Sequence, residues 1–368
     1  MNGNFRNPEL SKMILQKIIP LARKVTCRLG RPPVLMEVCG THTTAIARLG
    51  LRSLLAGLCD LRSGPGCPVC VTAQEDLDQI IALAQSTNVI VATFGDLLRV
   101  PGTYSSLEIE RAKKANVKIF YSPVDAVDFA AANPQQDVVF LGIGFETTAP
   151  AVAFSLALAK KRGLKNYTVF CLHKLVPPVL QSVLSDPELL IDGLILPGHV
   201  SAITGRAAFD FIAARYGIPA VITGFEPVDI LEAVYILLKQ LLAGRAQTVN
   251  GYPRLVKEEG NLKAKEILRE YFIMTAVNWR GFGLISQSGL AIPEKYNFLD
   301  AATRFPVNVR CLSPALKGCA CGDVLKGKIT PFQCPLFARS CSPLHPVGPC
   351  MVSAEGTCAA YYHYEQDR

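Results

Sequence analysis

The sequence contains no apolar segment long enough to cross a membrane and no run of basic residues. The longest apolar stretches, such as 138–145 (VVFLGIGF), fall far short of the roughly 20 residues that a spanning helix needs. The first residues, MNGNFRNPELSK, carry no apolar signal-peptide run. Lys and Arg are spread along the chain, so the net charge of +8 indicates no nucleic-acid-binding arm, although it could favour an acidic protein partner. We therefore expect a soluble cytoplasmic protein with no membrane and no nucleic-acid partner.

The C-terminal part of the chain also lacks the paired C-x₂-C knuckles that are usual for zinc, yet cysteine is abundant there. The chain has thirteen cysteines, and seven of them lie after residue 310. In a chain without a signal peptide, such clustering is typical of metal binding or thiol chemistry rather than of a disulfide framework. Six of these cysteines crowd together near the end: Cys319, Cys321, Cys334, Cys341, Cys350 and Cys358.

This cysteine-rich tail favours an iron–sulfur cluster over two alternatives. Four thiolates satisfy a cluster and leave two thiols for redox chemistry beside it. Zinc also takes four thiolates, but its usual knuckles are missing, and buried reduced cysteines seldom crowd so closely. A loop-rich unit of this size also needs a metal or cross-links for stability. Spacing alone permits several choices of the four ligands. The other cysteines are expected to be small core residues: Cys27, Cys59, Cys171 and Cys311.

Apolar stretches of strand length alternate with helical periodicity before this tail, which predicts parallel sheets with helical crossovers. The strands 33–39 and 137–144 are each followed by the pattern G-x-x-T-T-A, which suggests an internal duplication. We therefore predict two related Rossmann-like α/β domains that face a cleft, followed by a small iron–sulfur and redox domain. The predicted boundaries are 1–135, 136–305 and 306–368.

Four chemically active residues follow predicted strands at their carboxyl ends: Cys39, His42, Glu146 and His199. Ligands of open parallel sheets bind beyond these ends, so the four side chains are expected to meet in the cleft. Cys and His together suit a transition metal. Each residue also has a plainer interpretation, because Cys39 and His42 could be packing residues, Glu146 could cap the next helix and His199 could bond a neighbouring loop.

The loop 64–70 (GPGCPVC) brings a C-x-x-C pair to the same edge of the sheet. The following residues, 72–75, match a capping box, so Cys67 and Cys70 are expected just before a helix N-terminus. The helix dipole favours thiolate there, which suits disulfide exchange or binding of a soft metal.

Several long motifs together resemble the hydrogenase maturation protein HypD family, in order and over nearly the whole chain. The motifs are MEVCGTHT (36–43), GPGCPVC (64–70), GFETTAP (144–150), LPGHVSAITG (196–205) and the cysteine-rich tail.

The resemblance implies a scaffold that builds the iron centre of nickel–iron hydrogenases. The family pairs with the small chaperone HypC, and cyanide arrives through HypE while carbon monoxide is also attached to the iron. Cys39 would then match the iron-binding cysteine, with His42 beside the iron. Cys67 and Cys70 would match the family's C-x-x-C, which is implicated in iron binding or electron supply.

The tail is similar in layout to ferredoxin:thioredoxin reductase, in which cluster ligands and a redox disulfide interleave. That likeness implies a disulfide between Cys321 and Cys350. It implies that a 4Fe–4S cluster is held by Cys319, Cys334, Cys341 and Cys358.

The sequence is therefore consistent with two functions. The first is an iron-assembly scaffold with an internal cluster-to-thiol relay, for which the resemblance leaves open whether the protein is a catalyst or a platform. The second is a free-standing iron–sulfur thiol–disulfide oxidoreductase, which would act on an external disulfide and would not depend on Cys39.

Overall fold

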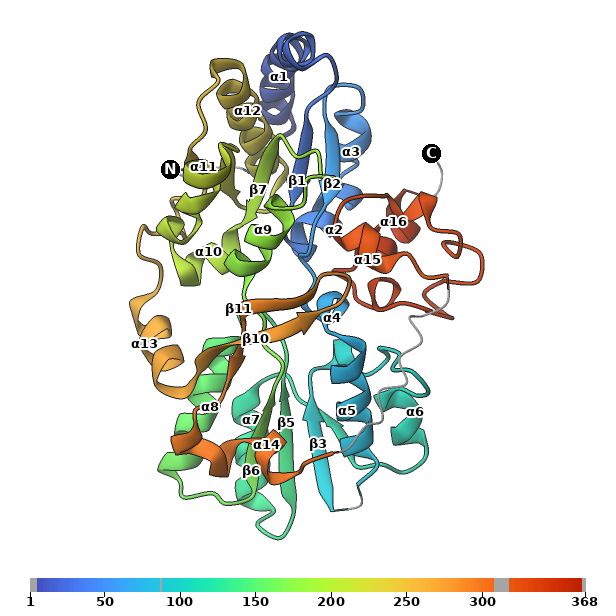
Figure 1. The fold of residues 1–368 in the computed structure, drawn as a ribbon, viewed down its shortest axis with the longest axis vertical. Helices are drawn as coiled ribbons and strands as arrows, with labels where there is room; N and C mark the ends of the chain where they lie inside the picture. Colours follow the sequence, from blue (N-terminus) through green and yellow to red (C-terminus); the bar gives the residue numbers. More distant parts are fainter. Residues whose placement is uncertain (1–4, 87, 308–317, 366–368) are drawn as a thin grey trace.

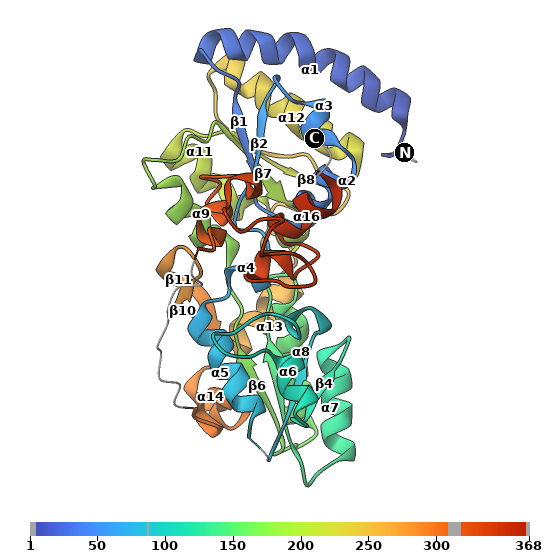
Figure 2. The same cartoon turned by 90° about the vertical axis from the view of Figure 1, so that its right-hand side faces the viewer.

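The computed structural model describes residues 5–86, 88–307 and 318–365, which form two α/β lobes with the cysteine-rich tail beside the junction (Figure 1). Helix α1 lies across the far end of the upper lobe, and the tail lies at the level where the two lobes meet (Figure 2). No helix in the described parts of the chain is both long enough and apolar enough to span a membrane.

The upper lobe is built on a five-stranded parallel sheet in the order β2-β1-β7-β8-β9. Its strands are β1 (Val34–Glu37), β2 (Asp60–Ser63), β7 (Gly193–Pro197), β8 (Ala220–Thr223) and β9 (Thr248–Asn250). Its helices are α1 (Pro8–Leu29), α2 (Gly40–Arg48), α3 (Leu51–Leu54), α10 (Gly198–Thr204), α11 (Asp210–Tyr216) and α12 (Pro227–Ala243).

The lower lobe is built on a four-stranded parallel sheet in the order β4-β3-β5-β6. Its strands are β3 (Val89–Thr93), β4 (Val117–Ile119), β5 (Asp137–Gly142) and β6 (Tyr167–Cys171). Its helices are α5 (Gln74–Ala84), α6 (Leu107–Ala112), α7 (Pro123–Ala132), α8 (Ala149–Lys161), α13 (Leu262–Tyr271) and α14 (Ala301–Arg304).

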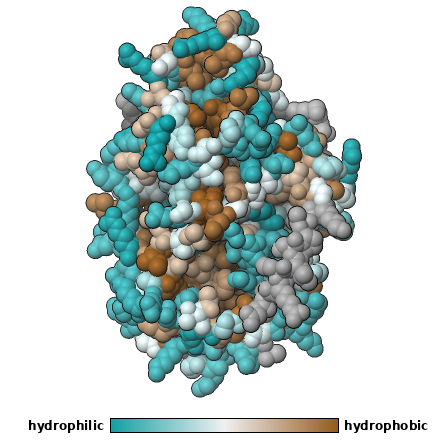
Figure 3. All heavy atoms as spheres, in the orientation of Figure 1, coloured by the Kyte–Doolittle hydropathy of each residue, from teal (hydrophilic) through white to brown (hydrophobic). Residues whose placement is uncertain are grey.

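An antiparallel hairpin of β10 (Ile273–Trp279) and β11 (Gly283–Ala291) crosses the middle of the molecule (Figure 1). Apolar residues gather on the surface in this middle region (Figure 3), and the hairpin contributes the exposed Ile273, Met274 and Leu284. Helix α9 (Val176–Leu184) packs against β11. The tail is mostly loop, with the short helices α15 (Cys321–Leu325) and α16 (Thr357–Tyr364).

Local sequence signals explain where the long helices begin and end. Asn7 caps α1 by accepting the backbone N–H of Glu9 at 2.9 Å, and Gly30 ends the helix with a positive φ of 71°. One side of α1, including Ile18 and Val25, is fully buried in a core that it shares with α12 and the upper sheet. This burial ties the first helix to a segment some two hundred residues later in the printed sequence.

The parallel α/β class is confirmed, but the predicted boundary at 135/136 does not separate the lobes. Strand β1 pairs with β7, and β3 pairs with β5, so each sheet takes strands from both sides of that boundary. The strand orders β2-β1-β7-β8 and β6-β5-β3-β4 are equivalent if β1–β4 and β5–β8 are two copies of one unit. The two copies have therefore exchanged half of their strands, so the boundary marks the end of a repeat and not of a lobe.

Candidate functional site

A cavity of about 560 Å³ lies between the lobes, where the carboxyl ends of β1, β3, β5 and β7 face one another. The cleft was predicted from strand ends, and Cys39 and His199 line this cavity. Sequence reasoning missed Asp96, which follows β3, and Glu355, which the tail contributes. The other lining residues include Thr41, Gly66, Pro68, Phe94, Gly144, Phe145, Thr147, Thr148 and Val200.

Cys39 is the N-cap residue of α2 and is half-buried at the cavity wall. Burial raises the pKa of its thiol to about 12, an effect that the nearby backbone N–H of His42 partly opposes. The free thiol is therefore protonated at neutral pH. A bound metal cation would have to replace that proton, because the thiolate is the form that binds metals.

Glu37 lies directly behind Cys39 and is completely buried at the end of β1. One carboxylate oxygen accepts the backbone N–H of Cys39 at 3.1 Å, and the other accepts the hydroxyl of Thr43 at 2.6 Å. Burial raises the pKa of Glu37 to about 7. The sequence carried a signal for this residue, since an acid interrupts the apolar strand VLMEV.

His42 and His199 lie on opposite sides of the Phe225 ring, with centroid distances of 4.5 Å and 4.2 Å. His42 is buried, and its Nε2 lies 2.8 Å from the Gly224 carbonyl oxygen, which can only accept, so Nε2 carries the proton. Burial lowers the pKa of His42 to about 4, so the ring is neutral, and its Nδ1 has no partner among the described atoms. Of the two imidazoles, only that of His199 lines the cavity.

The sequence suggested that Glu146 could cap the helix that follows it, but the structure shows a different contact. Its Oε1 accepts the backbone N–H of Val176 at 2.9 Å, so it caps the start of α9 instead. The side chain is buried, which raises its pKa to about 7. The neighbouring Phe145 and Thr147 line the cavity, whereas Glu146 does not, so the structure separates this residue from Cys39 and His199.

Cys67 and Cys70 form a disulfide, and both are almost fully buried. Their predicted position before a capped helix is wrong in detail. Cys67 is the N-cap of the one-turn helix α4 (Pro68–Val71), which contains Cys70, while α5 starts later with Ala73 as its N-cap and no side-chain cap. The one-turn helix was missed because four residues leave no periodicity to detect.

The C-x-x-C loop lies directly against the Cys39 turn. The backbone N–H of Gly40 donates to the Gly66 carbonyl at 2.9 Å, and a side chain at Gly66 would overlap the backbone of Cys39. The Cys39 turn and the C-x-x-C loop are thus neighbours, and residues of both line the cavity.

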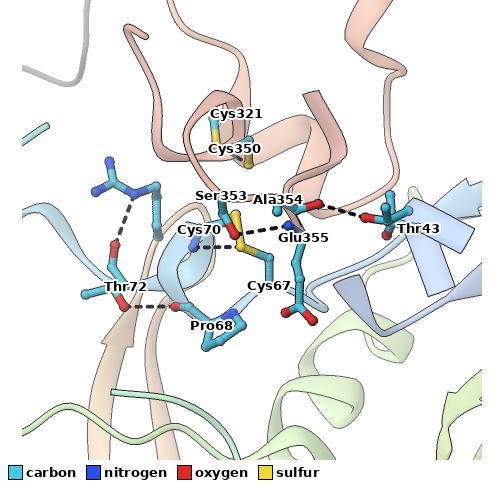
Figure 4. The surroundings of a disulfide bond; sticks show 12 residues. Thr43, Cys67, Pro68, Cys70, Thr72, Cys321, Cys350, Ser353, Ala354 and Glu355 are labelled. Carbon is cyan, nitrogen blue, oxygen red and sulfur yellow. Dashed lines mark hydrogen bonds between the residues drawn. A yellow bond between two sulfur atoms is a disulfide. The ribbon is translucent and has the colours of Figure 1, made fainter. Parts of the chain in front are cut away.

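The tail places a second pair of thiols beside this disulfide (Figure 4). The sulfur atoms of Cys321 and Cys350 lie 2.9 Å apart and are both buried, although they are not bonded to each other. Helix α4 packs against the short turn Pro349–Met351, which carries Cys350. Elements from distant parts of the chain, each carrying cysteines of one pair, therefore pack against each other.

The four remaining tail cysteines fit a cluster by their chemistry. Cys334, Cys341 and Cys358 are buried and Cys319 is half-buried, so four sulfur donors lie in mostly apolar surroundings. The Val347 backbone N–H donates to the Cys341 sulfur at 3.4 Å, a type of contact that tunes cluster potentials. In the described ranges, however, no three His, Cys, Asp or Glu side chains are already gathered as a metal site.

Of the cysteines expected in the core, Cys27 does not lie there and Cys171 lies at its edge. Cys59 is buried as predicted, but Cys27 is exposed on α1 and Cys171 is only partly buried. Cys311 lies outside the described residues.

Comparisons with known proteins cover almost the whole chain. A family model for HypD, described as "Hydrogenase formation hypA family", matches residues 10–365. The hydrogenase maturation factor HypD of Rhodobacter capsulatus is 43% identical over 366 residues, covering 98% of this chain and 97% of that protein. The hydrogenase maturation factor HypD of Escherichia coli K12 is 41% identical over 366 residues, with the same coverage of 98% and 97%. The hydrogenase expression/formation protein HupD of Azotobacter chroococcum is 44% identical over 341 residues, covering 91% and 90%.

Proposed function

Because the chain belongs to the HypD family and so has its role in hydrogenase maturation, we propose that it is the scaffold on which the iron centre of nickel–iron hydrogenases receives cyanide and carbon monoxide. The partners in this proposal are the chaperone HypC and the cyanide donor HypE, in the cytoplasm. The observation that carries the proposal is the cavity between the lobes, which Cys39 lines beside the C-x-x-C loop.

Ferrous iron is the cargo of this scaffold, and Cys39 is its ligand from this chain. Binding releases the thiol proton to solvent and leaves the thiolate on the metal. A cavity wall with Phe94, Phe145 and Val200 keeps water away from the iron while strong-field ligands are added. A thiolate of HypC, entering from the open side of the cavity, would be a further ligand of the iron.

The two cysteine pairs supply a route for electrons toward the cavity. The Cys321 thiolate attacks the Cys67–Cys70 disulfide and forms a mixed disulfide, which Cys350 then resolves. The products are a Cys321–Cys350 disulfide and two reduced thiols at Cys67 and Cys70, so two electrons and two protons move between the pairs. The reduced thiols then lie beside Cys39 in a position to keep the iron ferrous.

A resident 4Fe–4S cluster belongs to the same proposal. Cys319, Cys334, Cys341 and Cys358 would hold it, and it would supply single electrons to regenerate the Cys321–Cys350 thiols. Buried thiols and the N–H donor at Cys341 support this assignment.

Iron and acid-labile sulfide analysis of anaerobically purified protein tests the proposal. We expect about four irons and four sulfides in the tail, plus further iron that Cys39→Ala abolishes without changing the sulfide content. Iron content that is the same in the wild type and in Cys39→Ala would refute the scaffold.

The packing of α4 against the Pro349–Met351 turn also favours the second candidate, a free-standing disulfide oxidoreductase. That enzyme would reduce an external protein disulfide without HypC, and Cys39→Ala would leave its turnover unchanged. Turnover by the isolated protein, together with no Cys39-dependent iron, would support this alternative.

A further inference from the structure

Glu37 is a completely buried carboxylate on an interior strand of the upper sheet. All four residues of β1 are buried, and Glu37 lies between Ser63 of β2 and Ile195 of β7. Placing a carboxylate in such a position is unfavourable unless other groups bond to it. A carboxylate at this buried position therefore indicates a role that an apolar side chain could not fill.

The Glu37 carboxylate interacts with Ser63 of β2 and bonds, with both of its oxygens, to the turn that carries Cys39. Its Oε2 accepts the Cys39 N–H at 3.1 Å, and its Oε1 accepts the Thr43 hydroxyl at 2.6 Å. The backbone N–H of Thr43 donates to the Cys39 carbonyl oxygen at 3.0 Å. The carboxylate and Thr43 therefore hold both backbone polar groups of Cys39.

The opposite side of the same turn is held by the C-x-x-C loop. The Gly64 N–H donates to the Glu37 carbonyl at 2.7 Å, and the Gly40 N–H donates to the Gly66 carbonyl. The guanidinium of Arg52, which bonds the Leu61 carbonyl and Glu365, is a buried cation whose charge acts on Glu37. Glu37 itself does not line the cavity, so any effect it has on a bound metal must pass through Cys39.

We propose that Glu37 is a positioning residue that fixes the Cys39 backbone so that its sulfur faces the cavity. This inference rests on the proposed use of Cys39 as an iron ligand. A metal ligand held by its own hydrogen bonds needs little reorganisation when the ion enters, which is how supporting residues raise metal affinity.

Binding of Co²⁺ alone to the full-length protein tests this role, with the cobalt–thiolate absorption band as readout and Cys39→Ala as the blank. Glu37→Met removes both acceptors but keeps the side chain's length and apolar burial. We expect it to weaken Cys39-dependent binding about tenfold or more. Glu37→Gln keeps one acceptor for the Cys39 N–H and should restore binding to within about threefold of wild type.

The outcomes separate this inference from the proposed function. If wild type and Cys39→Ala give the same cobalt band, Cys39 is no metal ligand and the proposed function itself fails. If Cys39-dependent binding exists but Glu37→Met matches wild type, only the positioning role is overturned. Should Glu37→Met fail to fold, Thr43→Val removes a single hydroxyl and is expected to weaken binding about threefold, and unchanged binding would again overturn the role.

Discussion

Glu146 should make the stability of the protein depend on pH in a direction opposite to that of most carboxylates. Its pKa is raised by burial from 4.5 to about 7, so the folded protein holds this proton between those values while the unfolded chain releases it. The stabilisation is complete below pH 4.5 and is lost as the pH rises to 7. Glu146→Gln keeps an acceptor for Val176, and its free energy of unfolding relative to wild type should rise by up to roughly 3 kcal/mol over that window.

Urea denaturation of the two proteins at a series of pH values measures this difference. The exposed Glu259→Gln is the matched control and should follow wild type at every pH. A constant difference between Glu146→Gln and wild type would show that Glu146 titrates alike in both states.

Gly66 is predicted to be intolerant of any side chain. A Cβ there would overlap backbone atoms of Cys39, whereas a Cβ at Gly95 would meet only a methyl of Ile119 at an ordinary 3.7 Å. Gly66→Ala should therefore cost about 1–3 kcal/mol of stability and most Cys39-dependent metal binding, while Gly95→Ala should change neither. Unfolding curves and cobalt titration of both variants measure these effects. A Gly66→Ala variant with wild-type stability and wild-type cobalt affinity would contradict the close packing of the two loops.

Helix α1 is an element whose contribution to stability lies on one face. Ile18 is fully buried against α12, whereas Met13 of the same helix is 54% exposed. We expect Ile18→Ala to lower the free energy of unfolding by about 2–5 kcal/mol, because it leaves a cavity, and Met13→Ala to cost well under 1 kcal/mol. Chemical denaturation distinguishes them, and equal losses would mean that α1 is not packed as described.

The contact between α4 and the Pro349–Met351 turn predicts a specific defect in thiol exchange. Cys350→Ser keeps Cys321 as an attacking thiol but removes the thiol that resolves the mixed disulfide. After anaerobic reduction of the tail, we expect one thiol of the Cys67–Cys70 pair to be freed as in wild type, and the other, held in the mixed disulfide with Cys321, to be freed about tenfold more slowly, as measured by mass tagging of thiols. The exposed Cys27→Ser is the control, and rapid release of both thiols in Cys350→Ser would exclude this route.

At the level of elements, most of what the sequence predicts is found, and the differences have physical causes. The strands at 33–39 and 137–144 are recognisable because buried parallel strands are continuously apolar. Cys39 and His199 are predictable because strand ends in such sheets face one cleft. Glu355 was not predictable, because no local sequence pattern shows that the tail packs on α2. The Thr41 hydroxyl of α2 donates to the Glu355 carboxylate at 2.7 Å.

At the level of the whole molecule, the strand exchange predicts that neither repeat folds alone. A fragment 1–135 would contain β1 and β2 without β7, and β3 and β4 without β5. We expect fragments 1–135 and 136–368 to be unfolded separately and to recover structure when produced together, as judged by circular dichroism and size-exclusion chromatography. A stable 1–135 fragment would show that the repeats are independent, as the sequence had suggested.

That exchange could not be deduced from the motifs, because a sequence repeat shows that two segments are alike and not which strands they pair with. Strands such as β1 and β5 are short and apolar, and several partners in either copy would bury them equally well. The pairing is decided by the crossover segments, which show neither helix nor strand periodicity. One of them, 64–73, carries the chain from the upper lobe to the lower.

The strand exchange also orders events on the ribosome. The lower sheet has all its strands once Cys171 has been made, whereas β1 and β2 must wait for β7, β8 and β9, the last of which ends at Asn250. At common elongation rates that delay is on the order of ten to forty seconds, during which β1 and β2 have only each other to pair with. The pocket around Cys39 also needs Glu355 from the tail, so it is among the last places to form. A nascent chain therefore has no closed pocket for the proposed iron until its synthesis is nearly finished.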